Sequence, residues 1–217
     1  MSRNAPTAAP TLERLGDRAY ESGAKISAEF FAISYGSLVR QILATCDENI
    51  DAVNHQLDEL GSRIGMRLIE EYVAKSQAPP CRVFARTAES IAKVGLKMFL
   101  GINGTVTNVV GSAAPEGRPG SGAAAGGASG TAQQQAYSIE FTDNPLNYLV
   151  ELPQHMQESI WYSNVLCGVI RGALEQVGIH TDVHFVRDTL RGHTTNEIRV
   201  ALKGVTKDSQ TFKTQKD

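Results

Sequence analysis

The sequence has few cysteines, few aromatic residues and no long apolar run. Its 217 residues include 3 cysteines, Cys46, Cys81 and Cys167, odd in number and far apart, which argues against a disulfide framework and against paired-cysteine metal sites. No stretch approaches the roughly 20 apolar residues that a membrane-spanning helix needs. The start, MSRNAPTAAPTLERLGDRAY, lacks the apolar core of a secretory signal. We therefore expect a cytoplasmic chain that folds as one domain without disulfides.

An excess of charge of one sign is also missing, because 21 Lys and Arg residues stand against 23 Asp and Glu residues. This balance predicts no nucleic-acid partner. The GxSxG, P-loop and GxGxxG motifs are absent too. His180, Asp182 and His184 alternate along one expected strand, but no further ligand stands at a suitable spacing, so we interpret them as a solvated face. The sequence therefore predicts no metal and no catalytic residue.

Hydrophobic periodicity divides the chain into an arm, a domain and a tail. Residues 1–24 have weak periodicity and predict a flexible arm, and residues 205–217 predict a mobile tail. Residues 111–136 contain no apolar side chain larger than alanine and predict a disordered loop. Helices are expected over 27–46, 50–76, 81–100 and 156–177, and strands over 105–110, 137–143, 179–186 and 197–204. Residues 25–204 thus predict an α+β domain, an antiparallel four-stranded sheet with helices on one face.

Glycines one turn apart stand in two of the expected helices. Gly61 and Gly65 lie inside the second helix, and each costs about 1 kcal/mol relative to alanine. This pair predicts a close approach by another helix, within the chain or between subunits. The last helix is apolar on nearly all sides, carries Gly168 and Gly172, and has Arg171 as its only cation. We expect this helix to be buried and Arg171 to have a carboxylate or carbonyl partner.

The expected helix over 81–100 has an apolar stripe and a basic stripe. The apolar stripe consists of Phe84, Ala88, Ile91, Gly95 and Met98. The basic stripe consists of Arg82, Arg86, Lys93 and Lys97. Glu89 falls inside the basic stripe, so a solvated, salt-bridged face is the alternative to a binding surface.

Cys81 stands where this helix is expected to begin, beside Arg82. The helix dipole and the cation there favour the thiolate, which predicts a sulfur more reactive than a core thiol. Attachment of an acyl group is one use of such a sulfur. The alternative is a small buried apolar side chain.

Seven segments, in this order, resemble the Bet-three subunits of the transport protein particle, TRAPP. The likeness covers about residues 25–203. The segments are SAEFFAISYGSLV, DAVNHQLDELGSRIGMRLIEEYVAKS, CRVFARTAESIAKVGLKMFLGI, NPL, ELP, YSNVLCGVIRGALEQV and FVRDTLRG.

The resemblance implies a non-enzymatic scaffold subunit of a vesicle-tethering complex in ER–Golgi transport. As an assembly, such a complex promotes nucleotide exchange on a Rab-family GTPase. The implied partners are other TRAPP subunits, including a homodimer or a heterodimer with related subunits, and the implied location is peripheral to Golgi and ER membranes.

The resemblance also implies a modified cysteine. The position that matches the family's palmitoylated residue is Cys81, and the palmitoyl chain would lie in a hydrophobic tunnel inside the domain. No other cofactor is implied. The tunnel would be lined by Phe84, Ala88, Ile91, Gly95 and Met98. A basic surface facing the membrane would consist of Lys25, Arg82, Lys93 and Lys97. A thiol enzyme and a fatty-acid carrier that use the same cysteine and tunnel remain as alternatives.

Overall fold

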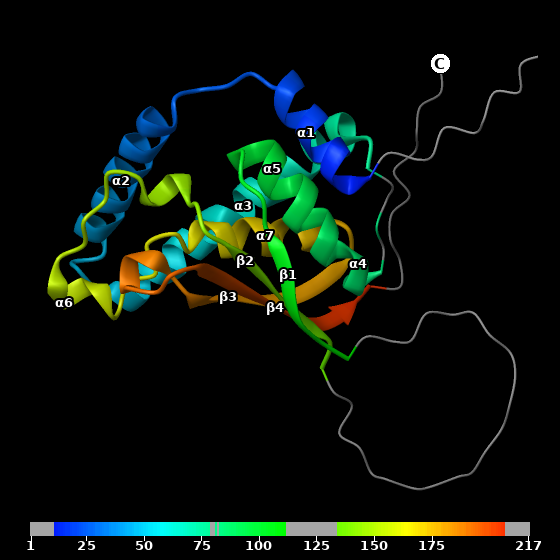
Figure 1. Cartoon of the computed structure of the whole chain (residues 1–217). Coiled ribbons are helices and arrows are strands. Elements are labelled where there is room, and N and C mark those ends of the chain that lie inside the picture. Colours follow the sequence, from blue (N-terminus) through cyan, green and yellow to red (C-terminus); the bar gives the residue numbers. More distant parts are fainter. Residues whose placement is uncertain (1–10, 79–80, 82, 112–133, 207–217) are drawn as a thin grey trace, which may run out of the picture.

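Helices dominate the first half of the chain, and strands alternate with helices in the second half (Figure 1). The computed structural model describes residues 11–78, 81, 83–111 and 134–206. The helices are α1 (Leu12–Ser22), α2 (Ala28–Thr45), α3 (Ile50–Ser76), α4 (Phe84–Glu89), the π-helix η1 (Ser90–Gly95), α5 (Leu96–Leu100), η2 (Pro145–Asn147), α6 (Gln154–Gln157), α7 (Val165–Gln176) and η3 (Thr189–Arg191). The strands are β1 (Thr105–Val110), β2 (Ala136–Phe141), β3 (Ile179–Arg187) and β4 (Asn196–Val205).

The four strands form one antiparallel sheet in the order β1-β2-β4-β3, and helices cover one of its faces (Figure 1). In the two central strands, Tyr137 pairs with Val200 and Ile139 pairs with Ile198. These side chains are at most 1% exposed, because alternate residues of a strand point to the same face. The fold class predicted from the sequence is confirmed.

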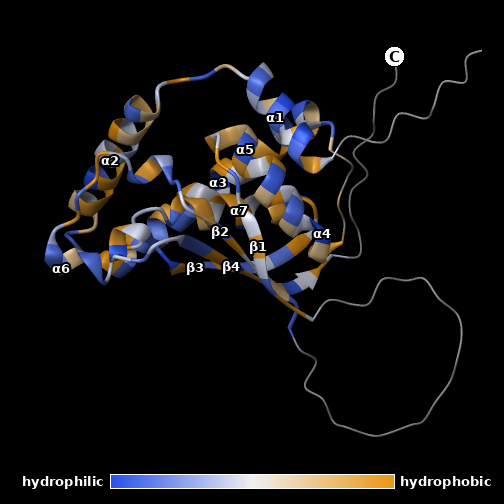
Figure 2. Cartoon of the chain, in the orientation of Figure 1, coloured by the Kyte–Doolittle hydropathy of each residue, from blue (hydrophilic) through white to orange (hydrophobic). Residues whose placement is uncertain are grey.

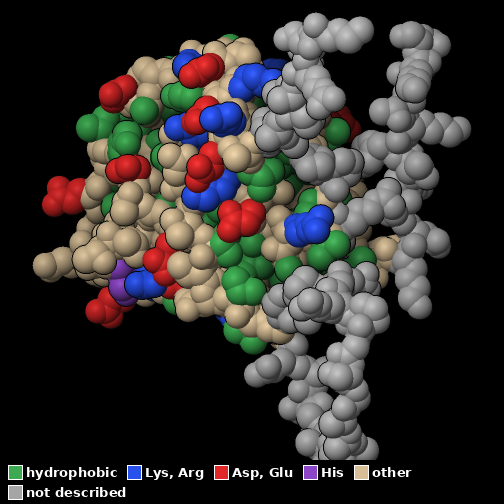
Figure 3. Space-filling view, turned by 45° about the vertical axis from the view of Figure 1, so that its right-hand side comes forward, with side chains coloured by type: hydrophobic (Ala, Val, Ile, Leu, Met, Phe, Trp, Pro, Cys, Tyr) green, Lys and Arg blue, Asp and Glu red, His purple; other side chains and the backbone are tan. Residues whose placement is uncertain are grey.

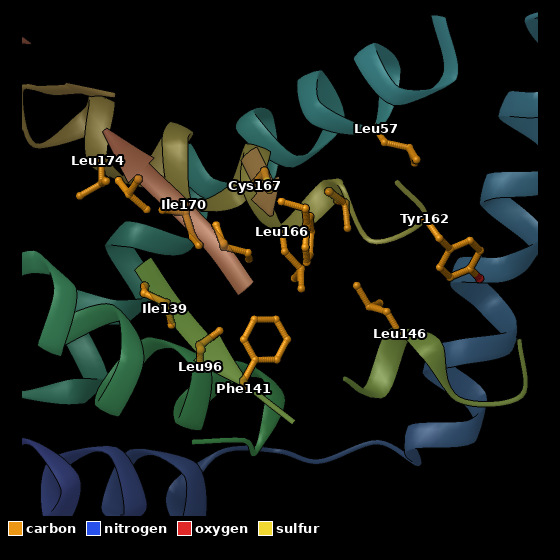
Figure 4. Packing of buried hydrophobic residues seen from close by; sticks show 14 of the residues in the cluster. Leu57, Leu96, Ile139, Phe141, Leu146, Tyr162, Leu166, Cys167, Ile170 and Leu174 are labelled. Carbon is orange, nitrogen blue, oxygen red and sulfur yellow. The ribbon is translucent and has the colours of Figure 1, made fainter. Parts of the chain in front are cut away.

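The hydrophobic core lies between this face of the sheet and α7 (Figure 4). Cys167 of α7 is fully buried in it, and burial raises the pKa of its thiol well above the usual range. Cys167 therefore acts as a small apolar side chain. Figure 4 shows the core side chains Leu57, Leu96, Ile139, Phe141, Leu146, Leu166, Ile170 and Leu174.

The glycine pairs bring α3 and α7 into backbone contact. A Cβ atom at Gly61 or Gly65 of α3 would lie 2.1 Å from a carbonyl oxygen of α7, and one at Gly168 or Gly172 would lie 2.0 or 2.1 Å from a carbonyl oxygen of α3. Only glycine, whose side chain is a single hydrogen atom, fits such a contact. The close approach predicted from Gly61 and Gly65 is therefore to a helix of the same chain.

Arg171 has the carboxylate partner that its burial required. Its guanidinium donates to Asp58 on α3, and the two side chains are 29% and 25% exposed. The ion pair lies beside the glycine contact and links the same two helices. The expectation of a partner for Arg171 is confirmed.

Removing Asp58 should destabilise the fold through Arg171. In the Asp58→Ala variant the guanidinium stays partly buried without a counterion, so we expect a loss of about 2 kcal/mol, below the cost of breaking a fully buried pair. Urea unfolding would measure it. The matched control is Glu59→Ala on the same helix, whose partner Arg63 is 74% exposed at 3.8 Å, and there we expect less than about 0.5 kcal/mol. Equal losses in the two variants would contradict this account.

Helix α1 corrects the prediction of a flexible arm for residues 12–22. The Arg14 backbone N–H donates to the Thr11 hydroxyl oxygen, which caps the helix. Leu15, Gly16 and Ala19 form its buried face, and two of these residues are too small to give a strong hydrophobic signal. Residues 1–10 lie outside the described part of the chain.

The predicted loop over 111–136 and the predicted tail over 205–217 are mostly outside the described residues. At their edges, β2 begins at Ala136 and β4 continues to Val205.

Strand β3 forms one edge of the sheet and carries the alternating polar residues noted in the sequence. The Lys203 ammonium lies 2.9 Å from the Asp182 carboxylate and holds the pKa of that carboxyl below its usual value. His184 Nδ1 lies 3.2 Å from the same carboxylate. Within the described ranges, no three His, Cys, Asp or Glu side chains are grouped as metal ligands would be.

Candidate acylation site

Cys81 lies in the short segment between α3 and α4. Its side chain is partly buried, and its thiol donates to the Val83 carbonyl oxygen at 3.4 Å. Burial raises the pKa of Tyr72 on α3 and of Tyr137 on β2, and the negative charge of a Cys81 thiolate adds to the rise in both. The sulfur is therefore close to both α3 and the sheet, at the border between surface and core.

The pKa of the Cys81 thiol is raised, which contradicts the expectation of an activated sulfur. Burial is the largest cause, and it outweighs the opposing charge of Arg86. The helix begins only at Phe84, so Cys81 is not in its first turn. Arg82, the cation expected to help, lies outside the described residues.

Alkylation of unmodified Cys81 should be slow at neutral pH. A raised pKa leaves more of the group as the thiol, which is not the nucleophile. We expect the rate with iodoacetamide to rise about tenfold per pH unit up to the pKa, since a tenfold change in thiolate follows each unit below it. Peptide mapping would follow Cys81 in the Cys46→Ser variant. A rate at neutral pH that does not change with pH would contradict the raised pKa.

A π turn changes which residues of the predicted apolar stripe face the core. In η1 the Leu96 N–H bonds to the Ile91 carbonyl, five residues back, and the Ala92 carbonyl accepts from Gly104 N–H at 3.0 Å. The wider turn moves the inward face forward by one position, as π bulges do.

The predicted tunnel residues therefore have different environments. Phe84 and Ala88 are buried in the core, and Ile91 is half-buried against it. Gly95 and Met98 are of intermediate exposure. The buried positions that continue the inward face are Ala92 and Leu96. The π turn that selects them gives no signal in a regular helical pattern.

Small residues leave space on this segment. A Cβ at Gly95 would meet only the Ser90 carbonyl oxygen, at 3.8 Å. A cavity of about 10 Å³ lies beside the start of α4, between Phe84, Val110 and Tyr137. That volume is room for about one water molecule.

Three residues of the predicted basic surface, Lys25, Lys93 and Lys97, lie against α1. Lys93 Nζ lies 3.2 Å from Glu13, and Lys97 Nζ lies 3.5 Å from Asp17. Lys25 Nζ lies 4.2 Å from the centre of the Tyr20 ring. The sequence suggested Glu89 as the acidic partner of the basic stripe; the partners Glu13 and Asp17 on α1 were missed because the arm was predicted to be flexible.

One face of α2 has exposed apolar side chains. Its other face packs into the fold through buried residues, among them Ala32, Tyr35 and Val39. The exposed set is Ile26, just before the helix, with Phe30 and Ile33, which are 67%, 65% and 62% exposed. Orange, hydrophobic residues are visible on α2 in Figure 2, whereas α1 is mostly blue. This face was not predicted, because the expected helix over 27–46 was identified only by its core-facing apolar residues.

The NPL and FVRDTLRG segments meet in a polar cluster at the end of the sheet. Asn144 accepts from the Leu146 N–H and caps η2, and Asn147 donates to Asp188 at 3.3 Å. Asp188 accepts from the Leu190 N–H and caps η3. Burial raises the pKa of its carboxyl. These motifs therefore hold connections between elements in place.

Comparison with known proteins identifies the family. The family model described as transport protein particle (TRAPP) component matches residues 31–201. The chain belongs to the TRAPP component family, as a subunit of the Bet3 type. It is 39% identical to transport protein particle subunit bet3 of Schizosaccharomyces pombe, over 90% of this chain and 94% of that protein. It is also 39% identical to trafficking protein particle complex subunit 3 of Dictyostelium discoideum, with the same coverage.

A solved structure of a Bet3-type subunit has the same fold. Trafficking protein particle complex subunit 3 from Naegleria fowleri is 42% identical, covers 83% of this chain and 98% of its own, and superposes with a TM-score of 0.69. That protein is covalently bound to palmitic acid. In the described part of this Bet3-type chain, no helix has the length and apolar composition needed to cross a bilayer.

Proposed function

We propose that this chain is a non-enzymatic core scaffold subunit of a TRAPP complex that tethers vesicles in ER–Golgi transport. In the proposal the assembled complex, and not this chain alone, promotes nucleotide exchange on a Rab-family GTPase. The observation that carries it is the match to Bet3-type subunits over nearly the whole of both chains. The proposed location is cytoplasmic, peripheral to Golgi and ER membranes.

The exchange assay tests this assignment. Release of labelled nucleotide from a Rab GTPase should be stimulated by the reconstituted complex that contains the chain, and not by the chain alone. Complex lacking the chain is the matched control. Stimulation by the isolated chain would refute the scaffold role, and equal activity of complexes with and without it would refute a role in exchange.

The same proposal places a palmitoyl chain on Cys81. The covalent palmitate of the Naegleria relative supports it, as does a sulfur at the border of the core. The acyl chain would run inward along Phe84 and Ala88, past Ile91, Gly95 and Met98. Because the cavity beside Phe84 holds only about 10 Å³, this path requires core side chains to move apart when the acyl group enters.

Intact mass spectrometry tests the site. We expect an adduct of palmitoyl mass that hydroxylamine removes, present in wild type and in Cys46→Ser but absent from Cys81→Ser. An adduct that persists in Cys81→Ser would show that another residue is modified. A fatty acid released by denaturation alone would indicate an exchangeable carrier instead of a thioester.

Association with a related subunit is proposed through α2. Its exposed residues Phe30 and Ile33 lie three positions apart, which places them on one side of the helix, and the exposed Ile26 lies just before its start. A second apolar helix would bury them. The double variant Phe30→Ser/Ile33→Ser should leave the fold intact and weaken dimer formation in analytical ultracentrifugation; an unchanged oligomeric state would exclude this surface.

The membrane-facing surface is proposed to consist of Lys25, Lys93 and Lys97, with Arg82 outside the described residues. Peripheral contact with anionic lipid is the use that such a surface supports. On the face shown in Figure 3, basic and acidic side chains lie next to each other. Glu13 and Asp17 pair with Lys93 and Lys97, so the proposed surface is not a patch of one sign in this conformation.

A further inference from the structure

Helix α1 sits directly on the segment that carries Lys93 and Lys97. A Cβ at Gly16 of α1 would lie 2.3 Å from the Lys93 carbonyl oxygen and 3.3 Å from the Lys97 Cβ. The contact therefore depends on a glycine in α1, and any larger residue at position 16 separates the helix from η1 and α5.

The acidic side of α1 covers the lysines. The Lys93 and Lys97 side chains are only 25% and 19% exposed, whereas their partners Glu13 and Asp17 are 68% and 57% exposed. The Tyr20 ring lies within 4.2 Å of Lys25 Nζ and 5.5 Å of Lys97 Nζ. Three side chains of α1 thus contact all three described lysines of the proposed membrane surface.

The hold of α1 on this surface is weak. It has 11 residues, fewer than an isolated helix needs for stability in water. Its buried residues are Leu15, Gly16 and Ala19, of which only one is large. Its ion pairs have exposed carboxylates, and such pairs contribute little and are screened by salt.

We propose that α1 is a displaceable cover that competes with an anionic lipid bilayer for Lys25, Lys93 and Lys97. This inference rests on the proposed membrane surface, and it adds that the docking of α1 regulates how that surface binds membranes. With α1 docked, Glu13 and Asp17 neutralise Lys93 and Lys97. Displacement of α1 uncovers Lys93 and Lys97 beside Lys25, which is already exposed, and anionic headgroups then replace the carboxylates. A bilayer fits better than a small anion, because the lysines come from two separate segments of the chain.

The Gly16→Ala variant of the full chain tests the cover without changing any charge. Its Cβ blocks docking on Lys93, while alanine favours the helix itself. We expect it to bind phosphatidylcholine vesicles that contain phosphatidylserine at least about fivefold more tightly than wild type, within the usual range of coupling between two competing states. Binding to pure phosphatidylcholine vesicles should not change. The matched control is Gly23→Ala, whose Cβ would meet only carbonyl oxygens at 3.5 Å or more.

Two more variants separate the possible failures. Glu13→Gln/Asp17→Asn should also strengthen binding to anionic vesicles, and Lys93→Gln/Lys97→Gln should weaken it in every background. If Gly16→Ala binds like wild type while the lysine variant binds less, the cover is refuted and the membrane surface stands. If the lysine variant binds like wild type, the membrane surface fails and the cover with it.

Hydrogen exchange gives a readout that vesicle affinity alone does not. Amides of residues 12–22 should lose protection when wild-type protein binds anionic vesicles, and α3 should keep its protection. If α1 remains protected in the membrane-bound protein, it is not displaced and the proposal is wrong. Equal strengthening of Gly16→Ala on neutral vesicles would also overturn it, since exposed apolar surface would then explain the binding.

Discussion

Replacing Gly61 or Gly168 with alanine should unfold much of the protein at temperatures where the wild type is stable. The added Cβ would lie 2.1 or 2.0 Å from a backbone carbonyl oxygen of the opposite helix. No side-chain rotation relieves a clash with backbone, so α3 and α7 must move apart and lose contacts along both helices. We expect each substitution to cost about 3–5 kcal/mol, at the upper end of overpacking effects.

In protein made without the acyl group, Gly95→Ala is the matched control, because it makes the same change in a helical segment that has space. Its Cβ would meet only one oxygen, at 3.8 Å, and the unfolded state loses conformational freedom, so we expect stability to stay or to rise by up to about 1 kcal/mol. Thermal and urea unfolding of the three variants would compare them. A Gly61→Ala loss no larger than that of Gly95→Ala would contradict the close helix contact.

Removing the proposed acyl chain should also lower the stability of the protein by a large amount. Burial of sixteen carbons is worth on the order of 10 kcal/mol before costs, at about 0.8 kcal/mol per methylene. Opening the packed region beside Phe84 reduces the gain, so we expect a net stabilisation of about 4 kcal/mol, which corresponds to a fall in Tm of roughly 10 °C on deacylation of a chain of this size.

Calorimetry before and after hydroxylamine would measure this fall. The Cys81→Ser variant, made without the acyl group, is the control and should melt at the deacylated temperature in both conditions. If hydroxylamine removes the adduct from wild type and leaves Tm unchanged, the acyl chain is not part of the core and is instead an exposed group.

The sequence predicted the parts of the fold in which local pattern and tertiary packing agree. Strands were expected over 137–143 and 197–204, where Ile139 and Ile198 are buried, and a helix was expected from residue 27, where the Ser27 hydroxyl accepts from the Phe30 N–H and caps α2. The contact between the glycine pairs of α3 and α7 could be predicted only in part. Spacing shows that a helix comes close, but it does not show which helix.

The site was harder to predict because its features depend on contacts distant in sequence. The raised pKa of Cys81 comes from burial, which no neighbouring residue encodes. The π turn of η1 moves the inward position from Ile91 to Ala92, and a regular period of 3.6 residues cannot anticipate it. Glu13 lies far along the chain from Lys93, and only the docking of α1 shows that they pair.

Strand β3 leaves one long side of the sheet open to solvent in the described part of the chain. Such a side invites strands of other molecules to add on, and charged or kinked residues are what natural proteins use to prevent it. Here Asp182, His184 and Arg187 stand along that side, and its register shifts near both ends. Growth of the sheet from one molecule into the next across β3 is thereby discouraged.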